Sequence, residues 1–257
     1  MRSVDDLRLR WLSMVAGVVA RPGMYAATGS EIELMADGLL ADLCFLDDRD
    51  ADYENAREEL LSRYGTLGVP GPFKTMFGLE RCQAEVTAVY AEVFSRLGYL
   101  PVENALDPGR WDQLTATLPA LLGDRDMRRS EAERVLGRAS IVIEHRILCY
   151  ASSRPGDGWI FLDCQADDCR AYDLTTGSYQ QIGDPEPIVR SARRSVGGFE
   201  DGLILTPYGK LLRWGPGWWI DDADPDWTPQ AQAIAGQLRD ADPFDQPAQT
   251  RPEAGES

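Results

Sequence analysis

The spacing of the hydrophobic residues changes near Gly137, and this change constrains the fold more than any other feature of the sequence. Before Gly137, apolar residues recur at intervals of three and four, which is the spacing of one helix face. After Gly137, the repeat is close to two, which is typical of strands. The sequence therefore predicts an α+β fold, in which a helical N-terminal half packs with a mostly antiparallel C-terminal sheet. We expect a helical region over residues 1–138, a sheet region over 139–240 and a disordered acidic tail over 241–257.

The helical half contains several separate apolar stripes. They predict helices over residues 7–20, 30–46, about 52–64, 80–97, 111–122 and 130–136. Ser30 with Glu33, and Ser130 with Glu133, have the spacing of a capping box, and Asp50 or Asp52 can cap the third helix. Residues 65–78 contain Gly-Val-Pro-Gly-Pro and predict an irregular loop.

The second half predicts hairpins with one helix inserted among them. Residues 141–150 alternate as a single long strand, and residues 159–164 return after the Arg-Pro-Gly-Asp-Gly turn as its hairpin partner. Prolines 185 and 187 suit the first turn of a helix that extends to about residue 196. The remaining predicted elements are short strands over 170–174 and 178–182, a hairpin of 203–206 with 210–214, a strand over 218–220 and a helix over 228–238.

The charge of the chain restricts its partners. The 42 Asp and Glu residues outnumber the 26 Lys and Arg residues, and the net charge is −16. Such a surface repels nucleic acid and anionic lipid, and it attracts a basic protein. The seven-residue apolar stretch before Arg21 is too short to span a membrane, and five scattered cysteines do not make a disulfide framework. We expect a cytoplasmic protein.

Few residues point to chemistry. The sequence contains no Walker loop, dinucleotide-binding Gly-x-Gly-x-x-Gly, Gly-x-Ser-x-Gly elbow or His-Glu-x-x-His, so we expect no cofactor. The single histidine, His145, excludes every metal motif that needs two. On one strand, His145 and Cys149 would lie about 13 Å apart, too far for a nucleophile–base pair. Cys164 and Cys169 lack the Cys-x-x-Cys spacing of zinc sites, so we interpret the aspartates around them as a solvated turn.

The segment Arg21-Pro-Gly-Met-Tyr25 resembles the segment that precedes the ATP-binding domain of type II DNA topoisomerases. That resemblance implies a following helix with a catalytic acid and an Asp-Asn pair, and then an Asp-x-Gly-x-Gly turn. The helix over 30–46 has no Asn, and Asp157-Gly158 lacks the second glycine. We therefore interpret Arg21–Tyr25 as a helix end followed by a turn.

Two groups of residues are candidates for a partner-binding site. The first surrounds Gly-Pro-Gly, where tryptophan can anchor a partner and arginine can bind a carboxylate. It comprises Arg213, Trp214, Trp218 and Trp219. The second is an acidic run of Asp47, Asp48, Asp50 and Asp52. Tryptophans at a hairpin end also pack in cores, and acidic runs are also ordinary solvated faces, so both interpretations stay open.

In its overall style, the chain resembles the immunity proteins of bacterial polymorphic toxin systems. It is acidic, rich in tryptophan, predicted to be α+β and without catalytic motifs. The resemblance implies a non-enzymatic protein that neutralises a basic toxin by occlusion. Two alternatives remain: a chaperone or scaffold for a secreted or phage-derived protein, and a hydrolase that uses a pair of carboxylates not yet identified.

Overall fold

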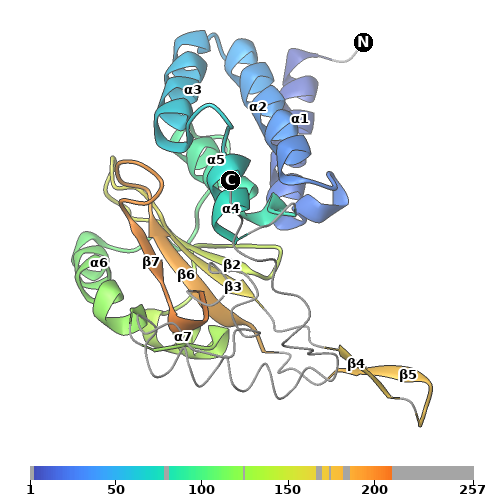
Figure 1. Cartoon of the computed structure of the whole chain (residues 1–257). Coiled ribbons are helices and arrows are strands. Elements are labelled where there is room, and N and C mark those ends of the chain that lie inside the picture. The colour runs from blue at the N-terminus through green and yellow to red at the C-terminus, as the bar shows by residue number, and fades with distance from the viewer. Residues whose placement is uncertain are drawn as a thin grey trace, which may run out of the picture.

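An antiparallel sheet lies between two groups of helices in the computed structural model of the chain (Figure 1). The structure describes residues 3–77, 81–123, 125–165, 170–173, 175–181 and 186–209. The α+β prediction is confirmed, with helices in the N-terminal half and the sheet in the C-terminal half. Among the described helices, none combines the length and the apolar character needed to cross a bilayer.

The N-terminal helices begin and end close to the predicted positions. Their bounds are α1 Val4–Ala20, η1 Pro22–Met24, α2 Gly29–Leu46, α3 Asp50–Tyr64, α4 Pro70–Phe77, α5 Gln83–Arg96, α6 Pro108–Leu122 and α7 Arg129–Leu136. The capping box of α2 is formed by Thr28 and Glu31 rather than by Ser30 and Glu33. Arg128 precedes α7 without a side-chain cap, so the predicted Ser130 box is also wrong. Asp50 and Asp52 lie in the first turn of α3, where they stabilise the positive end of the helix dipole without capping it.

The strands form one five-stranded sheet and a separate two-stranded hairpin. Their bounds are β1 Ile141–Ile143, β2 Ile147–Tyr150, β3 Ile160–Gln165, β4 Arg170–Asp173, β5 Ser178–Gln181, β6 Ile188–Arg194 and β7 Leu203–Leu205. The large sheet has the order β1-β2-β3-β6-β7, and each neighbouring pair is antiparallel. β4 pairs only with β5, and this hairpin projects away from the rest of the molecule (Figure 1).

Both faces of the large sheet are covered. On one face, Ile147, Cys149 and Phe161 join the core of α1, α2, α3 and α5. On the other face, Leu148 and Leu162 join the core of α6 and α7. Alternate residues of each strand therefore enter different cores, as a pleated strand requires.

Three predictions of local structure are wrong. Residues 141–150 form two strands and not one, because a tight turn at Glu144 and His145 reverses the chain. The predicted inserted helix over 185–196 is β6, which pairs with β3 and β7 and is buried on both faces. The predicted loop over 65–78 contains α4, whose first residue is a proline, as helix starts favour.

The residues of the β1–β2 turn are unusual for its backbone conformation, so the sequence did not indicate a turn there. Glu144 and His145 have φ of 50° and 55°, and the Arg146 amide donates to the Ile143 carbonyl at 2.9 Å. Glu144 and His145 are the two central residues of the turn from Ile143 to Arg146, and two positive φ values there define a primed turn, which usually carries Asn and Gly. His145 therefore lies in the turn, and its predicted place on a strand with Cys149 is wrong.

Several predictions fall on residues that the structure does not describe. They are the strands over 210–214 and 218–220, the helix over 228–238, the tail over 241–257 and the candidate residues Arg213, Trp214, Trp218 and Trp219. β7 is present as predicted, and its described partner is β6.

Candidate functional site

Half of the net negative charge of the chain lies on two neighbouring helices and the turn between them. Residues 29–64, which comprise α2, the connecting turn and α3, contain eleven acidic residues and three arginines. Their net charge of −8 is half of the net charge of −16 carried by all 257 residues. The helical layer therefore carries its largest excess of acidic residues on α2, α3 and the turn between them.

The four predicted aspartates lie together around the α2–α3 turn, and two of them are engaged within the protein. Asp47 accepts hydrogen bonds from the Arg8 guanidinium at 2.9 and 3.1 Å, and this contact holds the pKa of the Asp47 carboxyl below its usual range. Asp52 pairs with Arg49 at 2.6 Å. Asp48 and Asp50 are exposed and form no ion pair with any described residue.

Further along the same helices, Asp42 and Glu58 are also exposed, and each lacks an ionic partner within the described ranges. With Asp48 and Asp50 they make four solvated carboxylates. Charges of this kind contribute little to folding stability, and they are available to a partner.

Large apolar side chains lie exposed among these acids. Leu34 and Phe45 of α2 are 75% and 71% exposed, and Leu61 of α3 is 57% exposed. Leu34 and Phe45 are eleven residues apart, which places them on one side of the helix about 16 Å from each other. Gly38 lies between them, and no heavy atom is within 4 Å of the position that a Cβ would take there. Another chain can therefore approach the α2 backbone closely at Gly38.

A groove of about 230 Å³ lies between α2, α3 and the segment that leads to α4. Leu34 and Leu61 line it together with the buried side chains of Leu60, Val69 and Tyr90. Small-molecule sites usually measure about 300–1,000 Å³. The volume of this groove suits one or two side chains of a protein partner.

Two carboxylates line the same groove. Glu33 accepts a hydrogen bond from the Val69 amide at 2.7 Å, and burial raises the pKa of its carboxyl. Asp37 accepts a hydrogen bond from the Tyr53 hydroxyl at 3.1 Å. Arg57 also lines the groove, packed against the Tyr53 ring. The groove thus combines apolar walls with acidic side chains. We call the groove, the exposed stripe from Leu34 to Phe45 and the four solvated carboxylates described above the α2–α3 surface.

A second group of charged residues is buried between α5 and the sheet. Arg190 of β6 donates to Glu85 of α5 at 2.5 Å and to Asp163 of β3 at 2.8 Å. Arg146, at the end of the β1–β2 turn, donates to the same two carboxylates. Glu85 and Arg190 are each about 1% exposed. We call these four residues the ionic cluster.

The two carboxylates of the ionic cluster differ in proton affinity. Burial and the charge of Asp163 raise the pKa of Glu85. Burial also disfavours charge on Asp163, but Arg190 and Arg146 outweigh it and lower its pKa. Glu85 Oε2 is buried and accepts no hydrogen bond from the described part of the chain.

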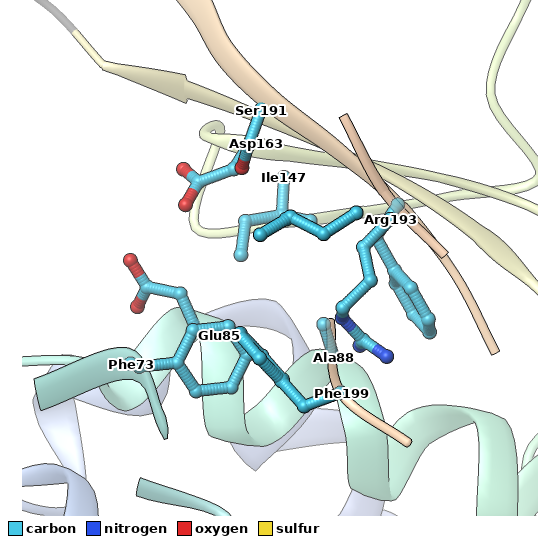
Figure 2. A pocket seen from close by; sticks show the side chains of 10 residues that line it. Phe73, Glu85, Ala88, Ile147, Asp163, Ser191, Arg193 and Phe199 are labelled. Carbon is cyan, nitrogen blue, oxygen red and sulfur yellow. The ribbon is translucent and has the colours of Figure 1, made fainter. Parts of the chain in front are cut away.

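A cavity of about 20 Å³ lies beside the ionic cluster (Figure 2). Glu85 and Asp163 face it from the helix and from the sheet, and Phe73 and Phe199 line it. Arg193 also lines it, with its guanidinium 4.4 Å from the centre of the Phe161 ring and within 6 Å of the Phe73 and Phe199 ring centres. A cavity of this size holds about one water molecule.

This geometry bears on the hydrolase alternative. Glycoside hydrolysis needs two carboxylates that flank a bound sugar. Glu85 and Asp163 are a buried pair, but both bind arginines and the cavity beside them has no room for a sugar ring. Their arrangement suits joining the helices to the sheet. Within the described ranges, no group of three or more His, Cys, Asp or Glu residues is placed to hold a metal ion.

Sequence reasoning found the acidic turn and missed both the groove and the ionic cluster. Leu34 and Leu61 lie on helices that the sequence predicted, but the helix ranges alone do not indicate that both leucines are exposed. Glu85 and Glu92 are both buried on α5, seven residues apart among apolar residues. Two glutamates at this spacing among apolar residues could have indicated that α5 has buried carboxylates.

Comparison with known proteins identifies no related protein. No family model, no curated protein and no solved structure matches this chain. Any functional conclusion therefore rests on the described residues themselves.

Proposed function

We propose that this chain is a non-catalytic binding protein whose α2–α3 surface receives a basic protein partner. The observation that carries the proposal is the concentration of charge, since residues 29–64 hold half of the net charge of the chain. Exposed Leu34, Phe45 and Leu61 lie among these charges. Interfaces commonly combine an apolar centre with a polar rim, and this surface offers both.

The charges and the apolar residues would act at different stages of binding. Solvated carboxylates such as Asp48 and Asp50 attract a basic protein over a distance and raise the rate of encounter. Burial of leucine and phenylalanine side chains then slows dissociation, because each fully buried side chain contributes about 1.5–3 kcal/mol. The same negative potential disfavours nucleic acid and anionic lipid as partners.

In the specific form of the proposal, the chain is an immunity protein that occludes the working surface of a basic toxin. Its acidity, its α+β fold and the absence of catalytic motifs from its sequence are the features that it shares with that class. The cysteines at 44, 149 and 164 are buried thiols outside any disulfide, which fits action in a reducing compartment such as the cytoplasm.

The test compares two variants of equal net charge in a pull-down from a lysate of the source organism. Asp48→Asn with Asp50→Asn removes two solvated charges from the α2–α3 surface. Asp5→Asn with Glu103→Gln removes two exposed charges elsewhere and serves as the matched control. Each bound fraction is washed at about 0.05 M and about 0.5 M salt and identified by mass spectrometry.

The proposal expects one basic protein that the wild type and the control retain at low salt and that the α2–α3 variant loses. If both variants retained the basic protein equally, the location of the removed charges would not matter for binding, and the proposal would be overturned. Failure of the wild type to retain any basic protein at low salt would overturn it as well.

A further inference from the structure

The α2–α3 surface has a shape as well as a charge. Its exposed stripe extends about 16 Å from Leu34 to Phe45, which equals three turns of a helix. Gly38 leaves the middle of the stripe open, and the groove beside Leu34 is large enough for one or two side chains. Two exposed apolar side chains three turns apart, with open backbone between them and a groove beside one of them, suit a helix that lies along α2.

We infer that the α2–α3 surface binds an amphipathic basic helix of the partner, with an apolar side chain of that helix seated in the groove between Leu34 and Leu61. This inference rests on the proposed function and specifies what part of the partner is recognised. Charge complementarity selects the occupant, because Glu33 and Asp37 line the groove and Asp42 and Asp48 flank the stripe. An acidic or neutral helix would leave these carboxylates without cations.

The groove itself is held open by contacts within the protein. The carboxylate of Glu33 occupies the space beside Gly68, and it accepts from the Val69 amide. Gly68 has φ of 72°, a backbone conformation that glycine adopts readily. A Cβ at Gly68 would lie 2.5 Å from the Glu33 carboxylate. The groove is therefore a preformed feature of the fold, and binding would not have to create it.

The experiment measures the affinity of three labelled peptides by fluorescence anisotropy at about 0.15 M salt. The probe is a peptide of about 18 residues whose leucines recur every three or four positions, with lysines on the rest of its surface. The second peptide has the same composition with the leucines distributed around the helix. In the third, glutamates replace the lysines.

The protein variants separate the groove from the general charge. Leu34→Ser with Leu61→Ser removes both walls of the groove, and Leu9→Ser removes a leucine that is 64% exposed on α1. Gly38→Gln places a side chain in the open middle of the stripe and improves helix propensity, so the variant remains folded.

We expect the wild type to prefer the amphipathic probe over the scrambled one, and not to bind the acidic peptide. The double leucine variant should lose at least about tenfold in affinity, since it removes both apolar walls that the partner's side chain would contact. Gly38→Gln should weaken binding comparably, and Leu9→Ser less than about twofold.

Equal binding of the two lysine peptides, unchanged in the leucine and glycine variants, would overturn the helix-in-groove inference. It would leave the proposed function standing, because the charges would still capture a basic partner. Absence of binding to either lysine peptide would overturn the inference as well, and the pull-down would then decide the proposed function separately.

Discussion

The Arg190 guanidinium donates to Glu85 Oε1 at 2.5 Å, and through this contact β6 is joined to α5. Both side chains are about 1% exposed. Taking two charges out of water costs several kcal/mol each, so the contact is stable only with further partners. Asp163 and Gln165 provide them on the Arg190 side, and Arg146 provides one on the Glu85 side. The interface between the helical layer and the sheet therefore depends on a complete set of ionic partners.

Arg190→Met should destabilise the fold by about 3–5 kcal/mol, because it leaves two buried carboxylates with Arg146 alone. Glu85→Gln in the same background removes one of those carboxylates. The double variant should therefore be more stable than the sum of the single losses predicts, by at least about 1 kcal/mol. Chemical denaturation of the wild type, the two single variants and the double variant measures this coupling energy.

Arg194→Met is the matched control for that cycle. Arg194 is the last residue of β6, it is only partly buried and it forms no ion pair with a described residue. Its substitution should cost much less than that of Arg190. Strict additivity of the Glu85 and Arg190 effects would contradict the view that the two residues act as one unit.

The contribution of Asp126 to folding stability should fall as the pH rises. An ordinary carboxylate in an ion pair shows the opposite dependence, because its pKa is lowered by folding. Burial raises the pKa of its carboxyl to about 6, although the Tyr208 amide donates to it at 2.8 Å. The folded protein therefore binds this proton more tightly than the unfolded chain does. The contribution of Asp126 to stability is lost as the pH rises from about 4 through about 6.

Asp126→Asn should accordingly stabilise the protein at pH 7.5 and have little effect at pH 4. The gain at the higher pH should be on the order of 1–2 kcal/mol, which allows for the partial exposure of the side chain. The asparagine oxygen can still accept the hydrogen bond from the Tyr208 amide. Thermal denaturation of both proteins across this pH range measures the difference, and a variant effect that is constant with pH would refute the assignment.

The helical half of the fold could be predicted from sequence because its signals are local. The stripes of α1, α2 and α6 bury one face, and such a face repeats visibly along the chain. α5 differs, since residues 84–94 are buried on every side, and Glu85 and Glu92 are buried with them. From the sequence alone, a glutamate on a helix is expected to face solvent. The burial of Glu85 and Glu92 becomes apparent only when their distant partners are known.

The errors in the sheet half have a common physical cause. Local preferences favoured a helix after Pro185 and Pro187, but pairing of β6 with β3 and β7 prevailed. The partners of Arg190 lie as far as 105 residues away along the chain, so no local pattern specifies them. The acidic turn at Asp47–Asp52 was found from the sequence because its charges are contiguous. The groove was not found, because three separated segments form it.

The β1–β2 turn carries residues that do not suit its backbone, and replacing them should stabilise the protein. Glu144 and His145 both have positive φ, which costs a residue with a Cβ about 1–2 kcal/mol. Glu144→Asn combined with His145→Gly supplies the pair that this turn type favours. We expect a net gain of about 1 kcal/mol in the free energy of unfolding, since the added glycine also increases the entropy of the unfolded chain.

The matched control is Glu144→Ala with His145→Ala, which removes the same side chains and keeps both Cβ atoms in the left-handed region. It should give no gain in stability. Because Arg146 follows the turn and donates to Glu85 and Asp163, a better turn should also hold that guanidinium more firmly in the ionic cluster. The Asn-Gly variant should therefore retain its gain in wild-type protein and lose part of it when Arg146 is replaced by Met. An equal gain in both backgrounds would show that the turn and the ionic cluster are energetically independent.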